Sequence, residues 1–78
     1  MNKVVMYSTA TCPYCTMAKK LLDDRNLTYT EIRVDLNDEE RDKMIALSGR
    51  RTVPQIFIDD VHIGGYDDLY AHFKSSNK

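Results

Sequence analysis

The chain has 78 residues, of which 42% are hydrophobic and 29% are charged, and its formal net charge is -1. This length is enough for one small domain, and the composition is too apolar for a disordered protein. The balanced charge argues against the basic face that a nucleic-acid-binding protein needs. We therefore expect a single domain over residues 1–78, with residues 75–78 as a frayed tail.

The beginning of the chain carries no sign of a targeting segment. The apolar run over residues 4–6 is too short for a signal peptide, and the sequence contains no run long enough to span a membrane. We therefore expect a cytoplasmic protein with no membrane partner. In a reducing compartment, a lone pair of cysteines is more often catalytic or metal-binding than a permanent disulfide.

The first half of the chain alternates between strand and helix patterns. Residues 3–7 form a short apolar, β-branched run typical of a buried strand, and a small polar loop follows over residues 8–11. Pro13 suits the first position of a helix, so a helix is expected from Cys12 to about residues 25–26. The helix is expected to bury Tyr14, Ala18, Leu21 and Leu22 on one face and to turn Lys19, Lys20, Asp23 and Asp24 to water.

Residues 28–34 alternate in part, which predicts a second strand with Ile32 and Val34 on one face. The spacing of Asn37 and Glu40 is typical of a capping box, and it predicts a helix that ends at Gly49. The apolar positions of that helix are Met44, Ile45 and Leu47.

The last third of the chain predicts a hairpin and a helix. Residues 55–58, opened by Pro54, and residues 61–63 flank a two-residue turn. After two glycines, Asp67 or Asp68 is expected to cap a helix that carries Leu69, Tyr70 and Phe73 inward. The order βαβαββα predicts an α/β domain with a mixed sheet, in which the early strands are parallel and the hairpin is antiparallel.

The only two cysteines of the chain, Cys12 and Cys15, lie one helical turn apart. A disulfide between them would close a very small loop and stabilise the fold little. A zinc site would need a second pair of ligands, which His62 and His72 do not supply at the usual spacing. Redox exchange is favoured, because the N-terminus of a helix stabilises a thiolate at Cys12 and a disulfide across this turn would be strained and easily opened.

Three blocks of the sequence together resemble a dithiol glutaredoxin of the C-P-Y-C type: residues 12–15 (CPYC), 52–54 (TVP) and 64–68 (GGYDD). The resemblance covers nearly the whole chain. It implies a thioredoxin fold with a four-stranded mixed sheet and three helices, and the activity of a glutathione-dependent thiol-disulfide oxidoreductase. In this interpretation Cys12 is the attacking nucleophile and Cys15 is the resolving thiol.

The resemblance also implies two routes and no tightly bound cofactor or metal. Protein disulfides are reduced by both cysteines, and protein-glutathione mixed disulfides are reduced by Cys12 alone. Glutathione is the co-substrate that donates electrons. The expected partners are glutathione and disulfide-containing or glutathionylated proteins, with ribonucleotide reductase as one candidate, and the protein is expected to be a monomer.

A glutathione site follows from the same resemblance, over Tyr14, Thr52, Val53, Pro54, Gly65, Tyr66 and Asp67. The backbone of Val53 would pair with the peptide as a strand does, and the last helix with Asp67 would receive the γ-glutamyl end. Asp67 has a second possible role as a helix cap. The family's proline at this position follows a cis peptide bond.

Many relatives carry a lysine where this chain has Thr9. The donors at the helix end are therefore left to stabilise the thiolate, and an arginine is expected to meet the glycyl carboxylate of glutathione. The candidates are Arg41, Arg50 and Arg51.

Two alternative functions share the cysteine pair. One is a small electron donor reduced by thioredoxin reductase, and the glutathione-site blocks count against it. The other is a binding module in which two copies bridge an iron-sulfur cluster through Cys12 and glutathione. The proline and tyrosine between the cysteines resemble the electron-transfer branch of the family more than the cluster-binding branch.

Overall fold

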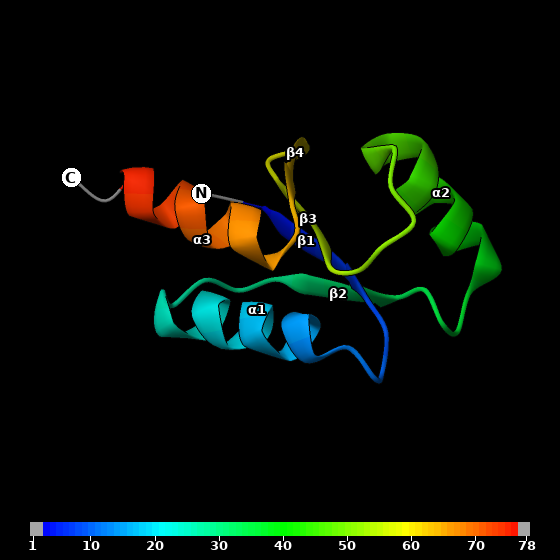
Figure 1. The fold of residues 1–78 in the computed structure, drawn as a ribbon, viewed down its shortest axis with the longest axis horizontal. Coiled ribbons are helices and arrows are strands. Elements are labelled where there is room, and N and C mark those ends of the chain that lie inside the picture. The colour runs from blue at the N-terminus through cyan, green and yellow to red at the C-terminus, as the bar shows by residue number, and fades with distance from the viewer. Residues whose placement is uncertain (1–2, 77–78) are drawn as a thin grey trace.

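The computed structural model describes residues 3–76, which form a four-stranded sheet and three helices (Figure 1). The elements are β1 (Val4–Ser8), α1 (Pro13–Asp24), β2 (Thr30–Arg33), α2 (Asp38–Ser48), β3 (Gln55–Ile58), β4 (Val61–Gly64) and α3 (Tyr66–Ser76). The strand order is β2-β1-β3-β4, with β1 and β2 parallel and the other pairs antiparallel. The predicted element order and mixed sheet are confirmed.

Alternate residues of β1 serve two separate cores, because successive side chains of a strand point to opposite faces. Val4 and Met6 belong to a cluster with the buried residues of α1 and α3, and Tyr7 belongs to a cluster with Met44 of α2. Figure 1 agrees with this layering, since α2 lies apart from α1 and α3. Strand β1 is therefore packed between α1 and α3 on one face and α2 on the other.

Strand β2 is shorter than residues 28–34, the range that the sequence predicts. Its four residues are those that pair with β1, in a register that runs from Val5 opposite Thr30 to Ser8 opposite Arg33. The prediction that Ile32 and Val34 share one face is confirmed, because both pack in the cluster that contains Met44 of α2.

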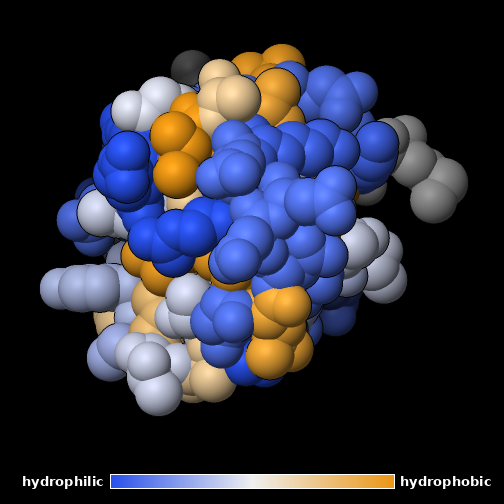
Figure 2. Space-filling model, turned by 90° about the vertical axis from the view of Figure 1, so that its right-hand side faces the viewer, coloured by the Kyte–Doolittle hydropathy of each residue, from blue (hydrophilic) through white to orange (hydrophobic). Residues whose placement is uncertain are grey.

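Three side chains expected to face inward are instead exposed: Tyr14 is 56% exposed, Leu47 55% and Tyr70 50%. In α3, Leu69 and Phe73 are one turn apart and occupy the stripe that faces the sheet, so Tyr70 is turned away from it. The end of the molecule at which α2 lies is largely hydrophilic, with separate hydrophobic groups (Figure 2).

The ends of α2 follow the sequence prediction in part. Asn37 accepts from the backbone N–H of Glu40 at 3.1 Å, and Gly49 ends the helix in the left-handed conformation with a φ of 73°. The reciprocal half of the capping box is not formed, because Glu40 Oε1 is buried without a hydrogen-bond partner among the described residues. Asp59 and Asp60 both have positive φ values, as the predicted tight hairpin turn requires.

The start of α3 differs from the prediction that Asp67 or Asp68 precedes it. Gly65 is the residue before the helix, and Asp68 reaches back from the first turn to accept from the Gly65 N–H at 3.1 Å. At the other end, Ser75 and Ser76 are still helical, and the rest of the predicted frayed tail, residues 77–78, lies outside the described residues. Within residues 3–76, no helix is long and apolar enough to cross a membrane.

Candidate active site

The cysteine pair lies where α1 begins. Cys12 is the N-cap residue, with extended backbone angles, and Pro13 is the first helical residue, one position later than predicted. The Cys12 sulfur accepts from the backbone N–H of Cys15 at 3.1 Å, so it takes up one of the donors that the first turn leaves unpaired. The donor and the positive end of the helix dipole therefore both face the Cys12 sulfur.

Cys15 occupies a different environment from its partner. It is 1% exposed, and both cysteines are free thiols. Burial, followed by the hydrogen bond to Cys12, raises the pKa of Cys15 to about 12, although the Thr9 backbone and the Lys19 charge act to lower that pKa. Cys15 is therefore a buried, protonated thiol at neutral pH. Cys12, in contrast, is partly exposed to solvent.

The loop in front of Cys12 is attached to the second strand. Asp35, just after β2, accepts from the backbone N–H of Ala10 at 3.2 Å and from two nitrogens of Arg33 at 2.7 Å each. The hydrogen bond from Arg33 is the main reason why the pKa of the Asp35 carboxyl is lowered to about 2. An ionised carboxylate therefore holds the loop in place at neutral pH.

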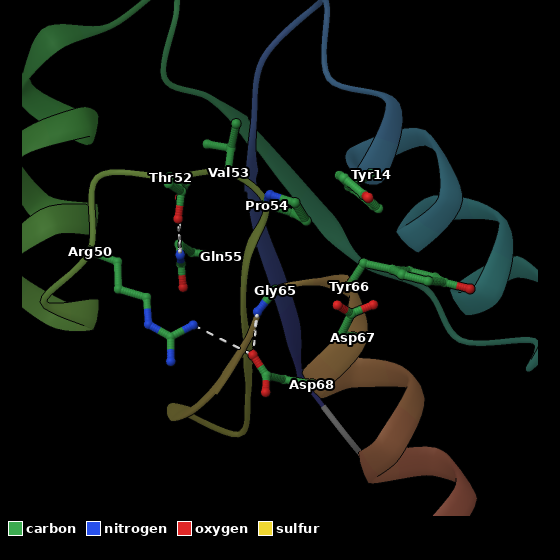
Figure 3. A pocket seen from close by; sticks show the side chains of 10 residues that line it. All are labelled: Tyr14, Arg50, Thr52, Val53, Pro54, Gln55, Gly65, Tyr66, Asp67 and Asp68. Atoms are coloured by element: carbon green, nitrogen blue, oxygen red, sulfur yellow. Dashed lines mark hydrogen bonds and ion pairs between the residues drawn. The ribbon is translucent and has the colours of Figure 1, made fainter.

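A cavity of about 300 Å³ opens between Tyr14 of α1, the loop that precedes β3 and the first turn of α3 (Figure 3). One wall is formed by the rings of Tyr14 and Tyr66, which stack with their centroids 6.4 Å apart. The cavity brings together seven of the residues predicted to bind glutathione: Tyr14, Thr52, Val53, Pro54, Gly65, Tyr66 and Asp67. The exposure of Tyr14, which the helix pattern placed inward, follows from this position.

The loop over residues 52–54 connects the cavity to the nucleophile. The Cys12 thiol donates to the carbonyl oxygen of Val53, with 3.6 Å between sulfur and oxygen, and the Val53–Pro54 peptide bond is cis. The Gln55 side chain links this loop to β4. Its nitrogen donates to the Thr52 carbonyl at 3.0 Å, and its oxygen is 2.7 Å from His62 Nε2.

Two residues of the cavity wall, Gln55 and Asp68, were not among the predicted binding residues, and of the three candidate arginines Arg50 is the one that lines the cavity. Gln55 is 1% exposed. A polar residue that opens an apolar strand is the signal that would have identified it. Arg50 Nη1 lies 3.5 Å from Asp68 Oδ2, and a dashed line marks this ion pair in Figure 3. Arg41, in α2, and Arg51 do not line this cavity.

Comparison with known proteins identifies relatives over most of the chain. The family model described as Glutaredoxin matches residues 4–63. Glutaredoxin 3 of Escherichia coli (strain K12) is 54% identical over 71 residues, which are 91% of this chain and 86% of that protein. A glutaredoxin of Neisseria meningitidis is 52% identical over 71 residues, 90% of this chain and 84% of that protein. The crystal structure of a buckwheat glutaredoxin-glutathione complex superposes with a TM-score of 0.87 at 33% identity, covering 96% of this chain and 71% of that chain.

Proposed function

The chain belongs to the glutaredoxin family, and from that premise we propose how its residues carry out glutathione-dependent thiol-disulfide exchange. As a member of the family, the protein is a glutathione-dependent thiol-disulfide oxidoreductase with a thioredoxin fold. We propose that Cys12 is the nucleophile and Cys15 the resolving thiol. The observation that carries this assignment is the Cys12 sulfur itself, which caps α1 and contacts the Val53 carbonyl at the cavity.

In the monothiol route, the Cys12 thiolate attacks the glutathione sulfur of a protein-glutathione mixed disulfide. A bond forms between Cys12 and glutathione, and the protein sulfur leaves with the electron pair and takes up a proton. A second glutathione thiolate then attacks the bound glutathione sulfur and releases glutathione disulfide and the Cys12 thiolate. Cys15 has no role in this route.

In the dithiol route, the Cys12 thiolate attacks a protein disulfide, and one protein sulfur leaves as a thiol. Cys15 then attacks the Cys12 sulfur, so that the Cys12–Cys15 disulfide forms and the second protein thiol leaves. Two glutathione molecules reduce this disulfide in turn. The burial of Cys15 supports the order of events, because a buried thiol is not the first to meet a substrate.

Glutathione is expected to lie in the cavity next to Cys12. The backbone of Val53 would pair with its cysteine unit as a strand would. The N-terminal end of α3, with Asp67 in its first turn, would receive the γ-glutamyl carboxylate and ammonium. Among the three candidate arginines, Arg50 is the one that lines this cavity, so we assign the glycyl carboxylate to it.

The choice of protein substrates stays a prediction. Disulfide-containing and glutathionylated proteins are the expected class, and ribonucleotide reductase, a monomeric state and a cytoplasmic location are predictions that await their own tests. The turnover assay distinguishes reduction by thioredoxin reductase, and anaerobic reconstitution followed by visible absorption tests cluster binding.

The test is turnover of a small glutathione mixed disulfide, coupled to glutathione reductase and NADPH. The wild type should turn over and Cys12→Ser should not. Cys15→Ser should keep this activity and lose the reduction of protein disulfides. Loss of both activities in Cys15→Ser would contradict the division of roles, and an inactive wild type that accepts electrons from thioredoxin reductase would favour the alternative donor.

A further inference from the structure

A polar cluster of Ser8, Lys19 and Glu31 lies near the resolving cysteine, where β1, α1 and β2 meet. Ser8 is fully buried at the end of β1, and its hydroxyl donates to Glu31 Oε2 at 2.5 Å. The Lys19 ammonium is 2.7 Å from the same carboxylate oxygen. The sequence predicts that Lys19 faces water, but its side chain is only 34% exposed, because the carboxylate on β2 draws it against the sheet.

This cluster is adjacent to Cys15 by two connections. Cys15 and Lys19 are four residues apart in α1, so their side chains lie on the same face of the helix, with Cβ atoms about 5–6 Å apart. Ser8 directly precedes Thr9, whose backbone lowers the pKa of Cys15. Helix α1 thus places a cation anchored by β2 one turn from a buried sulfur.

We propose that Lys19, held in place by Glu31 and Ser8, is a positioning residue that stabilises the Cys15 thiolate while Cys15 resolves a mixed disulfide on Cys12. The proposal rests on the dithiol route described above. It gives the Lys19–Glu31 ion pair a function in the dithiol route. The monothiol route does not need this ion pair, because Cys15 has no role in it.

The need for such a group follows from the resolving step. The Cys15 thiol loses its proton to solvent, its sulfur bonds to the Cys12 sulfur, and the bond from Cys12 to the substrate breaks. The electron pair leaves on the substrate sulfur, which takes up a proton. Because burial opposes the thiolate of Cys15, the rate of this step depends on any group that favours the anion.

The influence of Cys12 on Cys15 changes during the cycle. In the free enzyme, the hydrogen bond with Cys12 and the charge of Cys12 both raise the pKa of Cys15. Once Cys12 is part of a mixed disulfide, its sulfur carries no charge and that opposition is removed. The Thr9 backbone and the Lys19 ammonium, which lower the pKa of Cys15, remain. The thiolate of Cys15 is therefore easiest to form at the step in which Cys15 attacks the Cys12 sulfur.

The charges around Lys19 keep it cationic. Its pKa is raised, chiefly by the hydrogen bond to Glu31, with smaller contributions from the charges of Tyr29 and Cys15. Burial acts to raise the pKa of Glu31, but the hydrogen bonds from Lys19 and Ser8 outweigh it and the pKa is lowered. Both partners are thus ionised through the neutral range.

The experiment is a stopped-flow reaction of the reduced protein with excess 5,5'-dithiobis(2-nitrobenzoate), followed at the absorbance of the released thionitrobenzoate. Attack by Cys12 releases the first equivalent, and resolution by Cys15 releases the second. The two phases therefore report the two cysteines within one trace. Cys15→Ser should abolish the second phase, and a Cys15→Ser trace that keeps both phases would refute the assignment of roles rather than the role of Lys19.

Lys19→Met should slow the second phase and leave the first unchanged. The expected slowing is about three- to tenfold, since a charge near a protein surface acts through an effective dielectric of about 20 and the nucleophilicity of a thiolate falls as its pKa falls. The pH at which the second phase accelerates should also move to a higher value. Lys19→Arg, which keeps the cation, should restore both properties.

Lys20→Met is the matched control, because Lys20 is the next residue in α1 and its side chain is 79% exposed. It should leave both phases as in the wild type. An unchanged second phase in Lys19→Met, or an equal slowing in Lys20→Met, would overturn the proposal. Far-ultraviolet circular dichroism and the urea midpoint check folding, and Lys19→Gln replaces Lys19→Met if that variant does not fold.

Discussion

Gly64 connects β4 to α3, and we expect its replacement by alanine to destabilise the protein strongly. Its φ is 123°, a conformation that residues with a side chain rarely adopt. A Cβ atom at this position would lie 2.7 Å from Asp68 Cγ and 2.9 Å from Asp68 Cβ. Rotation of the Asp68 side chain would move Cγ but not Cβ, so the first turn of α3 would also have to shift.

The cost of Gly64→Ala has two main parts. A strained backbone conformation costs about 1–3 kcal/mol. Displacing Asp68 removes its capping hydrogen bond with the Gly65 N–H, which contributes about 1 kcal/mol, while the exposed pair with Arg50 contributes little. We expect the free energy of unfolding to fall by about 3 kcal/mol, which lowers the Tm of a domain of this size by roughly 12–24 °C.

Urea unfolding followed by circular dichroism measures this loss, with Gly49→Ala as the control. Gly49 also has a positive φ, 73°, but among the described residues no heavy atom lies within 4 Å of an added Cβ. Gly49→Ala should therefore lower the free energy of unfolding by only about 1 kcal/mol, the loss expected for a left-handed residue without a clash. Equal losses in the two variants would refute the argument that Asp68 packs too closely for a side chain at Gly64. A folded Gly64→Ala should also have a higher KM for glutathione, because the displaced turn lines the cavity.

Three further variants test the core, the loop before Cys12 and the cavity. Leu22→Ala should lower the free energy of unfolding by about 2–5 kcal/mol, because Leu22 is fully buried, whereas Leu47→Ala should cost less than about 0.5 kcal/mol; equal urea midpoints would contradict this. Because the pKa of Asp35 is lowered in the folded protein, its carboxylate stabilises the fold at pH values above the ordinary pKa of an aspartate, and this stabilisation is lost as the pH falls toward about 2. Asp35→Asn should therefore flatten the decline in Tm between about pH 5 and pH 2, as thermal unfolding at varied pH will show. Arg50→Gln should raise the KM for glutathione several-fold with little change in kcat, and Arg51→Gln should change neither, which steady-state kinetics at varied glutathione will decide.

The cavity could be assembled from the sequence only in part. The three sequence blocks located seven residues that the fold brings to one cavity, because each block combines backbone geometry with a fixed position in the element order. Arg50 could not be separated from its neighbour Arg51, since adjacent residues in a loop point in directions that the sequence does not encode. Gln55 was missed because its role depends on two partners, Thr52 and His62, that come from different segments.

The sequence by itself determined the order of the elements and the chemistry of the nucleophile. Hydrophobic periodicity, Pro13 and Gly49 act locally, so the strands, the helices and the helix end that carries Cys12 follow from short stretches of chain. Only the tertiary structure decided what surrounds Cys15. Ser8, Lys19 and Glu31 come from three elements, and packing α1 against the sheet converts an expected surface lysine into an anchored cation. Burial, which sets the pKa of Cys15, is likewise a property of the packed molecule, because it depends on which segments exclude water from the sulfur.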